Sequence, residues 1–516
     1  MVRRQSNLVT QQNVRTGSDD NEKDRRPLSR HLQQNIDYVH YRLHSPGDLI
    51  TKEIELGSTG LSLVLMSLDG MIDKTLVQQY VMKPIIAYAS KLDTEAVEPE
   101  RLVKQLKDEV LPSEEILSVY RMNDVLYAIL SGNTCLFLNG TDHALIIGTK
   151  GSPKRSIEEP QTESTIRGPK DGFTEDIRTN SALIRKRIKD PNLRMDSYLI
   201  GRVSKREVMV AYMQDIVNPK LVEEVKKRLN SIEIDDVEGS GYIEQWIADS
   251  FLSPFPQILN TERPDRFASS LLQGKVGLIV DGTPFQLIMP ISISDAFKSP
   301  EDYYQHWLVS SLIRALRYIS IFIATFLPGF YISLAEYHHG MIPSNIAFSI
   351  ASAREGVPFP VFIEAMLMEA TLEILREAGV RLPKPIGQTI GIVGGLVIGE
   401  AAVSAGLVSP VMVIVVAVTA IASFTLPSYS FGIVTRILRF FIMMLAAVLG
   451  LFGVILGFLI ICIHLVNLKS FGLPYMAPIS PLLPSDWKDL VLRAPVTFIR
   501  KRPEMLQTEN KKRMDD

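Results

Sequence analysis

Hydrophobic and polar residues are distributed very unevenly along this chain. Up to about residue 300, short apolar runs alternate with charged segments, whereas residues 308–468 are dominated by apolar side chains. Short apolar runs bounded by turn residues are typical of strands, and runs of about 20 apolar residues are typical of membrane-spanning helices. The pattern therefore predicts an α/β soluble N-terminal region, in two subdomains, followed by an all-α polytopic membrane domain.

The two soluble subdomains are expected at residues 37–150 and 201–305, with a connector rich in charge, proline and glycine at 151–200. Strands are predicted at 61–66, 125–130, 135–138, 144–148, 208–212, 276–280 and 285–289. Helices are predicted at 99–108, 113–122, 219–230 and 242–251. Residues 1–36 are polar and lack the apolar core of a signal peptide, so we expect a disordered cytoplasmic tail there.

The membrane domain is expected at residues 306–470, with four spans at 318–335, 386–408, 411–426 and 440–468. Arg314 and Arg317 precede the first span, and a basic tail at 471–516 follows the last. Because Lys and Arg concentrate on the cytoplasmic side of membrane proteins, both ends of the domain are expected there. The segment 360–378 is interpreted as a re-entrant or pore-lining helix, and a full crossing is the alternative.

This segment carries carboxylates among apolar residues, namely Glu364, Glu369 and Glu373, with Glu377 close behind. A charge at membrane depth costs about 2.5–3.5 kcal/mol on insertion scales, and like charges four residues apart weaken a helix. Pairing with Arg376 and Arg381 is one explanation. The other is that the stripe faces water, and copies from several subunits form an acidic ring that attracts cations.

The second explanation gives a pore or gate hypothesis with six residues: Val361, Phe362, Glu364, Ala365, Glu369 and Glu373. In it, Glu369 and Glu373 attract cations, while Val361, Phe362 and Ala365 form an apolar constriction. Glu400, inside the second predicted span, is a separate intramembrane acid that can also simply pair with a neighbouring helix.

Glycines recur every four residues in the second predicted span, at Gly387, Gly391, Gly395 and Gly399. A ridge of small residues lets two helix backbones approach closely in a membrane. The partner helix can belong to the same chain or to another subunit, and the spacing favours neither.

Composition and motifs narrow the class of function. The chain has 55 basic and 57 acidic residues, so no bulk charge indicates nucleic-acid binding. Its two cysteines, Cys135 and Cys462, lie too far apart in sequence to suggest a zinc motif. No nucleotide-binding loop, hydrolase or metalloprotease motif is present, so we expect no catalytic residues, no metal, no cofactor and no enzyme activity.

Several long motifs carry a family resemblance. They include Arg354-Glu355-Gly356-Val357-Pro358-Phe359-Pro360, residues 364–369, 373–379 and 392–399, and, outside the membrane domain, residues 157–160, 167–169, 261–265, 281–285 and 470–475. In these motifs the chain resembles the A subunits of spore germinant receptors, over roughly residues 40–505. A sporulation-stage paralogue group shares much of the membrane half and is the alternative family assignment.

The resemblance implies an integral protein of the spore inner membrane, with its soluble domains on the cytoplasmic (core) side. It implies two partners, a transporter-like B subunit that binds the nutrient and a lipoprotein C subunit. It also implies a homo-oligomeric ring whose centre conducts cations during germination. A non-conducting scaffold is the main rival function, and a secondary transporter is less favoured because only one broken segment, at 358–360, is evident.

Overall fold

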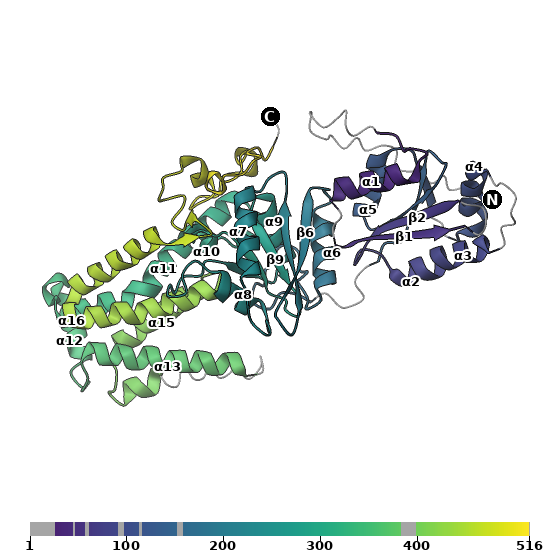
Figure 1. The fold of residues 1–516 in the computed structure, drawn as a ribbon. Helices are drawn as coiled ribbons and strands as arrows, with labels where there is room; N and C mark the ends of the chain where they lie inside the picture. Colours follow the sequence, from purple (N-terminus) through teal and green to yellow (C-terminus); the bar gives the residue numbers. More distant parts are fainter. Residues whose placement is uncertain are drawn as a thin grey trace, which may run out of the picture.

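The computed structural model describes residues 26–44, 47–56, 61–90, 98–112, 116–151, 158–382 and 399–514. Figure 1 shows an elongated molecule in which two α/β units and a bundle of helices follow one another. This arrangement confirms the predicted fold class, an α/β N-terminal region in two parts and a helical domain after it.

The first unit is a five-stranded antiparallel sheet of order β1-β2-β4-β5-β3. Its strands are β1 (Leu49–Glu55), β2 (Ser62–Leu68), β3 (Ile116–Val119), β4 (Thr134–Leu138) and β5 (Ala144–Ile147). Its helices are α1 (Leu32–Leu43), α2 (Lys74–Leu76), α3 (Lys83–Ala89), α4 (Pro99–Gln105) and α5 (Met122–Leu130). Side chains alternate between the two faces of a strand. Val64 and Met66 accordingly pack with α1 and α5, and Leu63 and Leu65 pack with α3 and α4.

Two predictions in this unit were wrong. Residues 125–130 form the second half of helix α5 instead of a strand, because Met122, Val125, Leu126 and Ile129 repeat at helical spacing and are all buried. Residues 116–119, within the predicted helix 113–122, form the edge strand β3, which pairs with β5.

The second unit has the same kind of sheet, antiparallel and of order β6-β7-β9-β10-β8. Its strands are β6 (Leu193–Ile200), β7 (Arg206–Met213), β8 (Leu259–Thr261), β9 (Val276–Val280) and β10 (Gln286–Met289). Its helices are α6 (Ile177–Arg187), α7 (Pro219–Asn230), α8 (Ser240–Ile247), α9 (Pro264–Leu272) and α10 (Ile293–Phe297). Helices α7 and α8 cover one face and α6 and α9 the other. The core under α6 and α9 continues into the helical domain through Phe431 and Leu465, so these two parts share one core.

The helical domain contains α11 (Trp307–Glu336), α12 (Ser344–Ala353), α13 (Val361–Arg381), α15 (Pro410–Phe424) and α16 (Tyr429–Asn467). By length and composition, α11 and α16 qualify as membrane-spanning, and α15 is apolar but shorter. Most of the predicted span 386–408 lies outside the described residues.

The predicted single span at 440–468 differs from the structure, because α16 folds back on itself at Gly450. This glycine has a φ of 59°, in the left-handed region that only glycine adopts without strain. Phe255 of the second unit contacts both Phe431 and His464, with ring centroids 5.9 and 5.8 Å apart. Phe431 and His464 are 33 positions apart, and a straight helix would place them about 50 Å from each other. The apolar run therefore forms two antiparallel arms, as Figure 1 shows.

Helix α13 runs the full depth of this domain. Its first turn lies beside Glu336, at the end of α11 that is far from the α/β units. Near the other end of α13, Arg376 contacts Ser423 and Phe424 at the end of α15, on the side of the α/β units. Its 21 residues correspond to about 31 Å, close to the thickness of a bilayer core.

Candidate functional site: the ion pairs of helix α13 and the junction above the helical domain

The start of α13 is fixed by the sequence before it. Pro358 and Pro360 stop the preceding chain from continuing as a helix, and Pro360 is the residue that caps α13. The first backbone N–H groups of a helix lack partners within it. Glu336 supplies one, because its Oε1 atom accepts a hydrogen bond of 3.0 Å from the backbone N–H of Phe362.

Glu364 is completely buried and links three segments. Its carboxylate forms an ion pair of 3.0 Å with Arg354 and accepts a 2.9 Å hydrogen bond from the backbone N–H of Ser409. Ser409 in turn caps α15. Glu364 therefore holds the loop before α13 against the start of α15.

Glu369 lies at mid-depth and pairs with an arginine from α16. Its Oε2 atom is 2.5 Å from Nη1 of Arg439, and both side chains are 3% exposed. The Nε atom of Arg439 also donates a 2.7 Å hydrogen bond to the carbonyl oxygen of Ala324 in α11. That carbonyl lacks its normal helical partner, because residue 328, four positions on, is a proline without an N–H group. One arginine thus donates to the free carbonyl at the break in α11 and to one oxygen of the carboxylate on α13.

The remaining carboxylates of α13 are also paired. Glu373 forms ion pairs with Arg436 of α16 and, at 3.3 Å, with Arg376. Glu377 pairs with Arg381 at 2.6 Å in an exposed contact. Pairing within the chain, one of the two explanations offered by the sequence, therefore describes Glu373 and Glu377, while the partner of Glu369 was not anticipated.

The residues of the predicted constriction pack inside the domain. Val361 and Ala365 are fully buried in a core with Met412 and Ile442, and Phe362 is partly buried against it. The outward face of α13 is apolar instead, with exposed residues Ile363, Leu367, Ala370 and Ile374. A pore role for the six residues stays a prediction, because the axis of the predicted pore lies between several copies of the chain and the structure contains one copy.

The other predicted residues are placed only in part. Gly387, Gly391 and Gly395 lie outside the described residues. A side chain at Gly399 would contact Val413 of α15 at 3.6 Å, which is ordinary packing distance. Glu400 is exposed on the surface of the domain.

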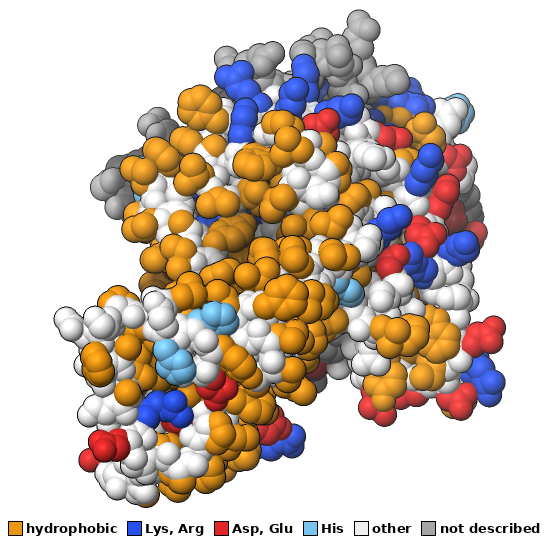
Figure 2. All heavy atoms as spheres, turned by 90° about the vertical axis from the view of Figure 1, so that its left-hand side faces the viewer, with side chains coloured by type: hydrophobic (Ala, Val, Ile, Leu, Met, Phe, Trp, Pro, Cys, Tyr) orange, Lys and Arg blue, Asp and Glu red, His pale blue; other side chains and the backbone are white. Residues whose placement is uncertain are grey.

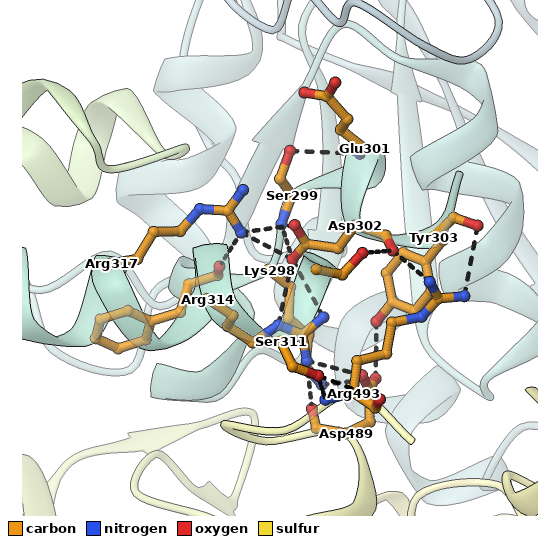
Figure 3. A network of polar contacts seen from close by, with 12 residues as sticks. Lys298, Ser299, Glu301, Asp302, Tyr303, Ser311, Arg314, Arg317, Asp489 and Arg493 are labelled. Carbon is orange, nitrogen blue, oxygen red and sulfur yellow. Dashed lines mark hydrogen bonds and ion pairs between the residues drawn. The ribbon is translucent and has the colours of Figure 1, made fainter. Parts of the chain in front are cut away.

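A second charged site joins the α/β region to the helical domain (Figure 3). Its centre is Asp302, in the 3-10 helix η4 (Pro300–Tyr303), which is buried. Arg314 and Arg317 of α11 donate to the Asp302 carboxylate at 3.1 and 2.8 Å. Arg314 also donates to Asp489 of the C-terminal segment, residues 469–514, at 2.8 Å. We call this set the junction network.

The C-terminal segment contributes a further arginine to this network. The Nη1 atom of Arg493 donates to the carbonyl oxygen of Asp302 at 2.6 Å, and its backbone N–H donates to Ser311 of α11 at 3.0 Å. Burial raises the pKa of Asp489, but the positive charges of Lys298 and Arg314 outweigh it and hold that pKa below the usual range. The network therefore keeps the Asp489 carboxylate charged, and it connects the second α/β unit, α11 and the C-terminal segment.

Sequence reasoning missed Arg354, Arg436 and Arg439 as partners of the α13 carboxylates. A usable signal existed for the last two, since they are arginines three positions apart directly before an apolar run. The predicted span began at residue 440 and so left them outside it.

Metal ligands were also sought among the described residues. One group, Glu100, Asp142 and His143, brings its ligand atoms within 4.8 Å of one another. Asp142 already contacts Arg30 at 3.6 Å, and Glu100 is exposed. This arrangement has the character of a surface charge cluster, and we assign no metal to it.

The fold and the site define a class: a helical domain with two candidate membrane-spanning helices and arginine–carboxylate pairs between its helices, attached to two α/β units. The family model described as "Bacillus/Clostridium GerA spore germination protein" matches residues 37–505. The chain belongs to this family, which confirms the family resemblance of its motifs.

Individual relatives agree with this assignment. The chain is 47% identical to spore germination protein GerLA of Bacillus cereus, over 91% of this chain and 94% of that protein. It is 45% identical to spore germination protein B1 of Bacillus subtilis (strain 168), over 92% and 96% of the two chains. The chain is also similar to a crystal structure, that of the N-terminal domain of the A subunit of the Bacillus megaterium spore germinant receptor GerK3. The match covers 51% of this chain and 96% of the chain in that structure, with 31% sequence identity and a TM-score of 0.40.

Proposed function

We propose that this chain is the A subunit of a nutrient germinant receptor and that copies of it form a nutrient-gated cation channel that triggers spore germination. Membership of the GerA spore germination family and the names of the relatives support the receptor role. The proposal includes a transporter-like B subunit and a lipoprotein C subunit as partners. It places the helices in the spore inner membrane and the α/β units on the core side.

The observation that carries the channel proposal is the Glu369–Arg439 pair. It lies near the middle of α13 and of the first arm of α16, where charged groups are expensive and are typical of ion pathways. The pair is only partly satisfied, since Glu369 Oε1 and Arg439 Nη2 are buried and have no hydrogen-bond partner among the described residues. Because full satisfaction is what makes a buried polar network rigid, this pair is less rigidly fixed, which supports a contact that changes during gating.

In the proposed mechanism the resting subunit keeps Glu369 and Glu373 on the arginines of α16. Nutrient binding at the B subunit moves α13 relative to α16, and the carboxylates of neighbouring copies then face a common water-filled axis. The same movement brings Val361, Phe362 and Ala365, which pack inside the resting subunit, to that axis as its apolar constriction. Glu364 stays paired with Arg354 and acts as the fixed end of the moving helix.

A scaffold without a pore is the second candidate, and one observation favours it. Each carboxylate of α13 already has an arginine partner in its own chain. In this alternative the pairs only hold the domain together, and ions pass through another subunit.

Cation efflux from liposomes distinguishes the two. We would compare the wild-type chain with Glu369→Gln and, as a matched control on the same helix, with Glu377→Gln, whose side chain is exposed. The channel proposal expects altered efflux rate or ion preference in Glu369→Gln only, with oligomer size unchanged. Efflux that is the same in all three proteins, measured with the B subunit and nutrient present, would contradict a role for Glu369 in the ion path.

A further inference from the structure

The C-terminal segment, residues 469–514, lies beside the first turns of α11. The backbone N–H of Arg493 donates to Ser311 at 3.0 Å, which puts the neighbouring Leu492 next to the start of this helix. Helix α11 has 30 residues and is about 45 Å long, whereas the hydrocarbon core of a bilayer measures about 30 Å. The side with Arg314 and Arg317 holds the excess length, because arginines are disfavoured in the hydrocarbon core. The first turns, and the segment bound to them, therefore lie at the level of the lipid headgroups when α11 spans a membrane.

Large apolar side chains are exposed at this level. They come from α11 and from the C-terminal segment and form what we call the interfacial patch: Trp307, Leu308, Leu312, Trp487, Leu492 and Phe498. Exposed tryptophans beside basic residues are typical of the membrane–water boundary. Figure 2, seen from the far end of the helical domain, shows apolar side chains over much of this domain, with Lys and Arg side chains gathered along the upper edge of the molecule.

A cavity of about 290 Å³ lies between the second α/β unit and the C-terminal segment, and Phe498 of the interfacial patch is part of its wall. Seven lysines and arginines line it against three aspartates. The aspartates are already used: Asp295 binds Lys275 at 2.8 Å, Asp489 binds Lys298 at 3.4 Å, and Asp486 accepts backbone hydrogen bonds from residues 504 and 505. The cavity therefore has an excess of positive charge.

Three of the basic residues carry this excess. Lys488, Lys501 and Arg513 line the cavity and are exposed to solvent. Among the residues that the structure describes, their side chains have no acidic partner within ion-pair distance. Clustered cationic N–H donors of this kind bind phosphate groups.

We propose that this cavity binds the phosphate-bearing headgroup of an anionic lipid, whose acyl chains lie against the interfacial patch. The level of the cavity, its charge and the presence of Phe498 of the interfacial patch in its wall together favour a lipid over a soluble anion. Two cavity residues, Lys298 and Asp489, also belong to the surroundings of Arg314, so the lipid sits against the junction network. The proposal does not depend on channel activity.

Tryptophan quenching by brominated lipids tests it. The full-length chain with Trp246→Phe, which leaves Trp307 and Trp487 as reporters, is placed in phosphatidylcholine nanodiscs that contain an equal fraction of either brominated phosphatidylglycerol or brominated phosphatidylcholine. We expect stronger quenching by the anionic lipid. The double variant Lys488→Gln/Lys501→Gln should lower the preference for it roughly tenfold or more, given the attraction of each basic side chain to an anionic surface.

Two control variants separate an effect of the cavity from a general effect of positive charge. Lys511→Gln/Lys512→Gln removes the same charge from the same segment outside the cavity and should keep the preference, as should Lys488→Arg/Lys501→Arg. Equal quenching by both lipids, or an equal loss in both glutamine variants, would overturn the proposal. Loss of the preference on addition of millimolar inorganic phosphate to the wild type would overturn it as well, since the cavity would then take free phosphate.

Discussion

The junction network and helix α13 both hold carboxylates against arginines away from water, but they do so differently. At the junction, Asp302 accepts from Arg314 and Arg317 through both of its carboxylate oxygens. Arg493 of the distant C-terminal segment donates to the Asp302 carbonyl, although its own Nε atom is buried without a hydrogen-bond partner among the described residues. On α13, Glu369 has Arg439 as its ion-pair partner, and one atom of each side chain stays without a hydrogen bond among the described residues.

This difference separates a fixed joint from a movable contact. A buried carboxylate with hydrogen bonds to both oxygens is held more rigidly than one with an unsatisfied oxygen. We therefore interpret the junction as the part that transmits force between the α/β units and α11, and the α13–α16 contact as the part that changes. Four predictions test this comparison, from the largest expected effect to the smallest.

Asp302→Asn should be the most damaging substitution. It leaves the buried guanidinium group of Arg317 without its carboxylate and that of Arg314 with Asp489 alone, and breaking a buried pair in this way costs about 3–5 kcal/mol. We expect a large drop in Tm of the full chain in detergent, measured by thermal unfolding. Glu301→Gln, in the same 3-10 helix, is the control and should change Tm little. A Tm for Asp302→Asn equal to that of the control would show that the junction is not a fixed joint.

A double-mutant cycle on Glu369 and Arg439 should give a different pattern. Each single change to glutamine leaves the opposite charge buried and should cost about 3 kcal/mol. The double variant removes both charges and should lie within about 1 kcal/mol of the wild type, since replacing a buried pair is often neutral. Thermal unfolding of the four proteins gives the coupling. Simple addition of the two single effects would contradict a direct pair.

Acid should weaken the α/β side of the junction through Asp295. Burial alone would raise the pKa of this carboxyl, but Lys275 and Lys298 lower it to about 2. Its charged form therefore stabilises the fold above about pH 4, and roughly 2 kcal/mol is lost as the pH falls from 4 to 2. Intrinsic fluorescence against pH should show this loss in the wild type and a smaller one in Asp295→Asn. Asp235→Asn, at an exposed ion pair, should follow the wild type.

Glu336→Ala should have the smallest of the four effects. It removes the acceptor for the backbone N–H of Phe362 at the start of α13, and a lost helix cap typically costs about 1 kcal/mol. Glu355→Ala, exposed in the loop before α13, is the matched control. If both variants unfold at the wild-type temperature, the cap does not contribute to the placement of α13.

Much of this architecture could be predicted from the sequence, because composition separates the two α/β units from the apolar helices. The start of α13 could also be predicted, since Pro358 and Pro360 prevent the preceding chain from continuing as a helix. The reversal at Gly450 could not, because an apolar run of 29 residues matches one tilted helix as well as two short arms. Tertiary contacts, such as those of Phe255 with both arms, distinguish these arrangements.

The carboxylates of the candidate site were recognised for a sound reason, their unusual position among apolar residues. Their partners were not, since pairing of Glu369 with Arg439 depends on how α13 and α16 pack side by side. The need of Ala324 for a hydrogen bond was equally hidden, although Pro328 implies it once α11 is known to be one continuous helix.

The most direct test of the central proposal is thiol modification on α13 in the open state. In a chain with Cys135 and Cys462 replaced by serine, we would compare Ala365→Cys, which is buried, with Ala370→Cys, on the outward face of the same helix. A water-soluble cationic thiol reagent is applied to the receptor reconstituted with its proposed B subunit. The account predicts that nutrient makes Ala365→Cys reactive and that its modification blocks cation flux, while Ala370→Cys is unaffected by nutrient. Full flux with no nutrient-dependent reaction at position 365 would contradict it.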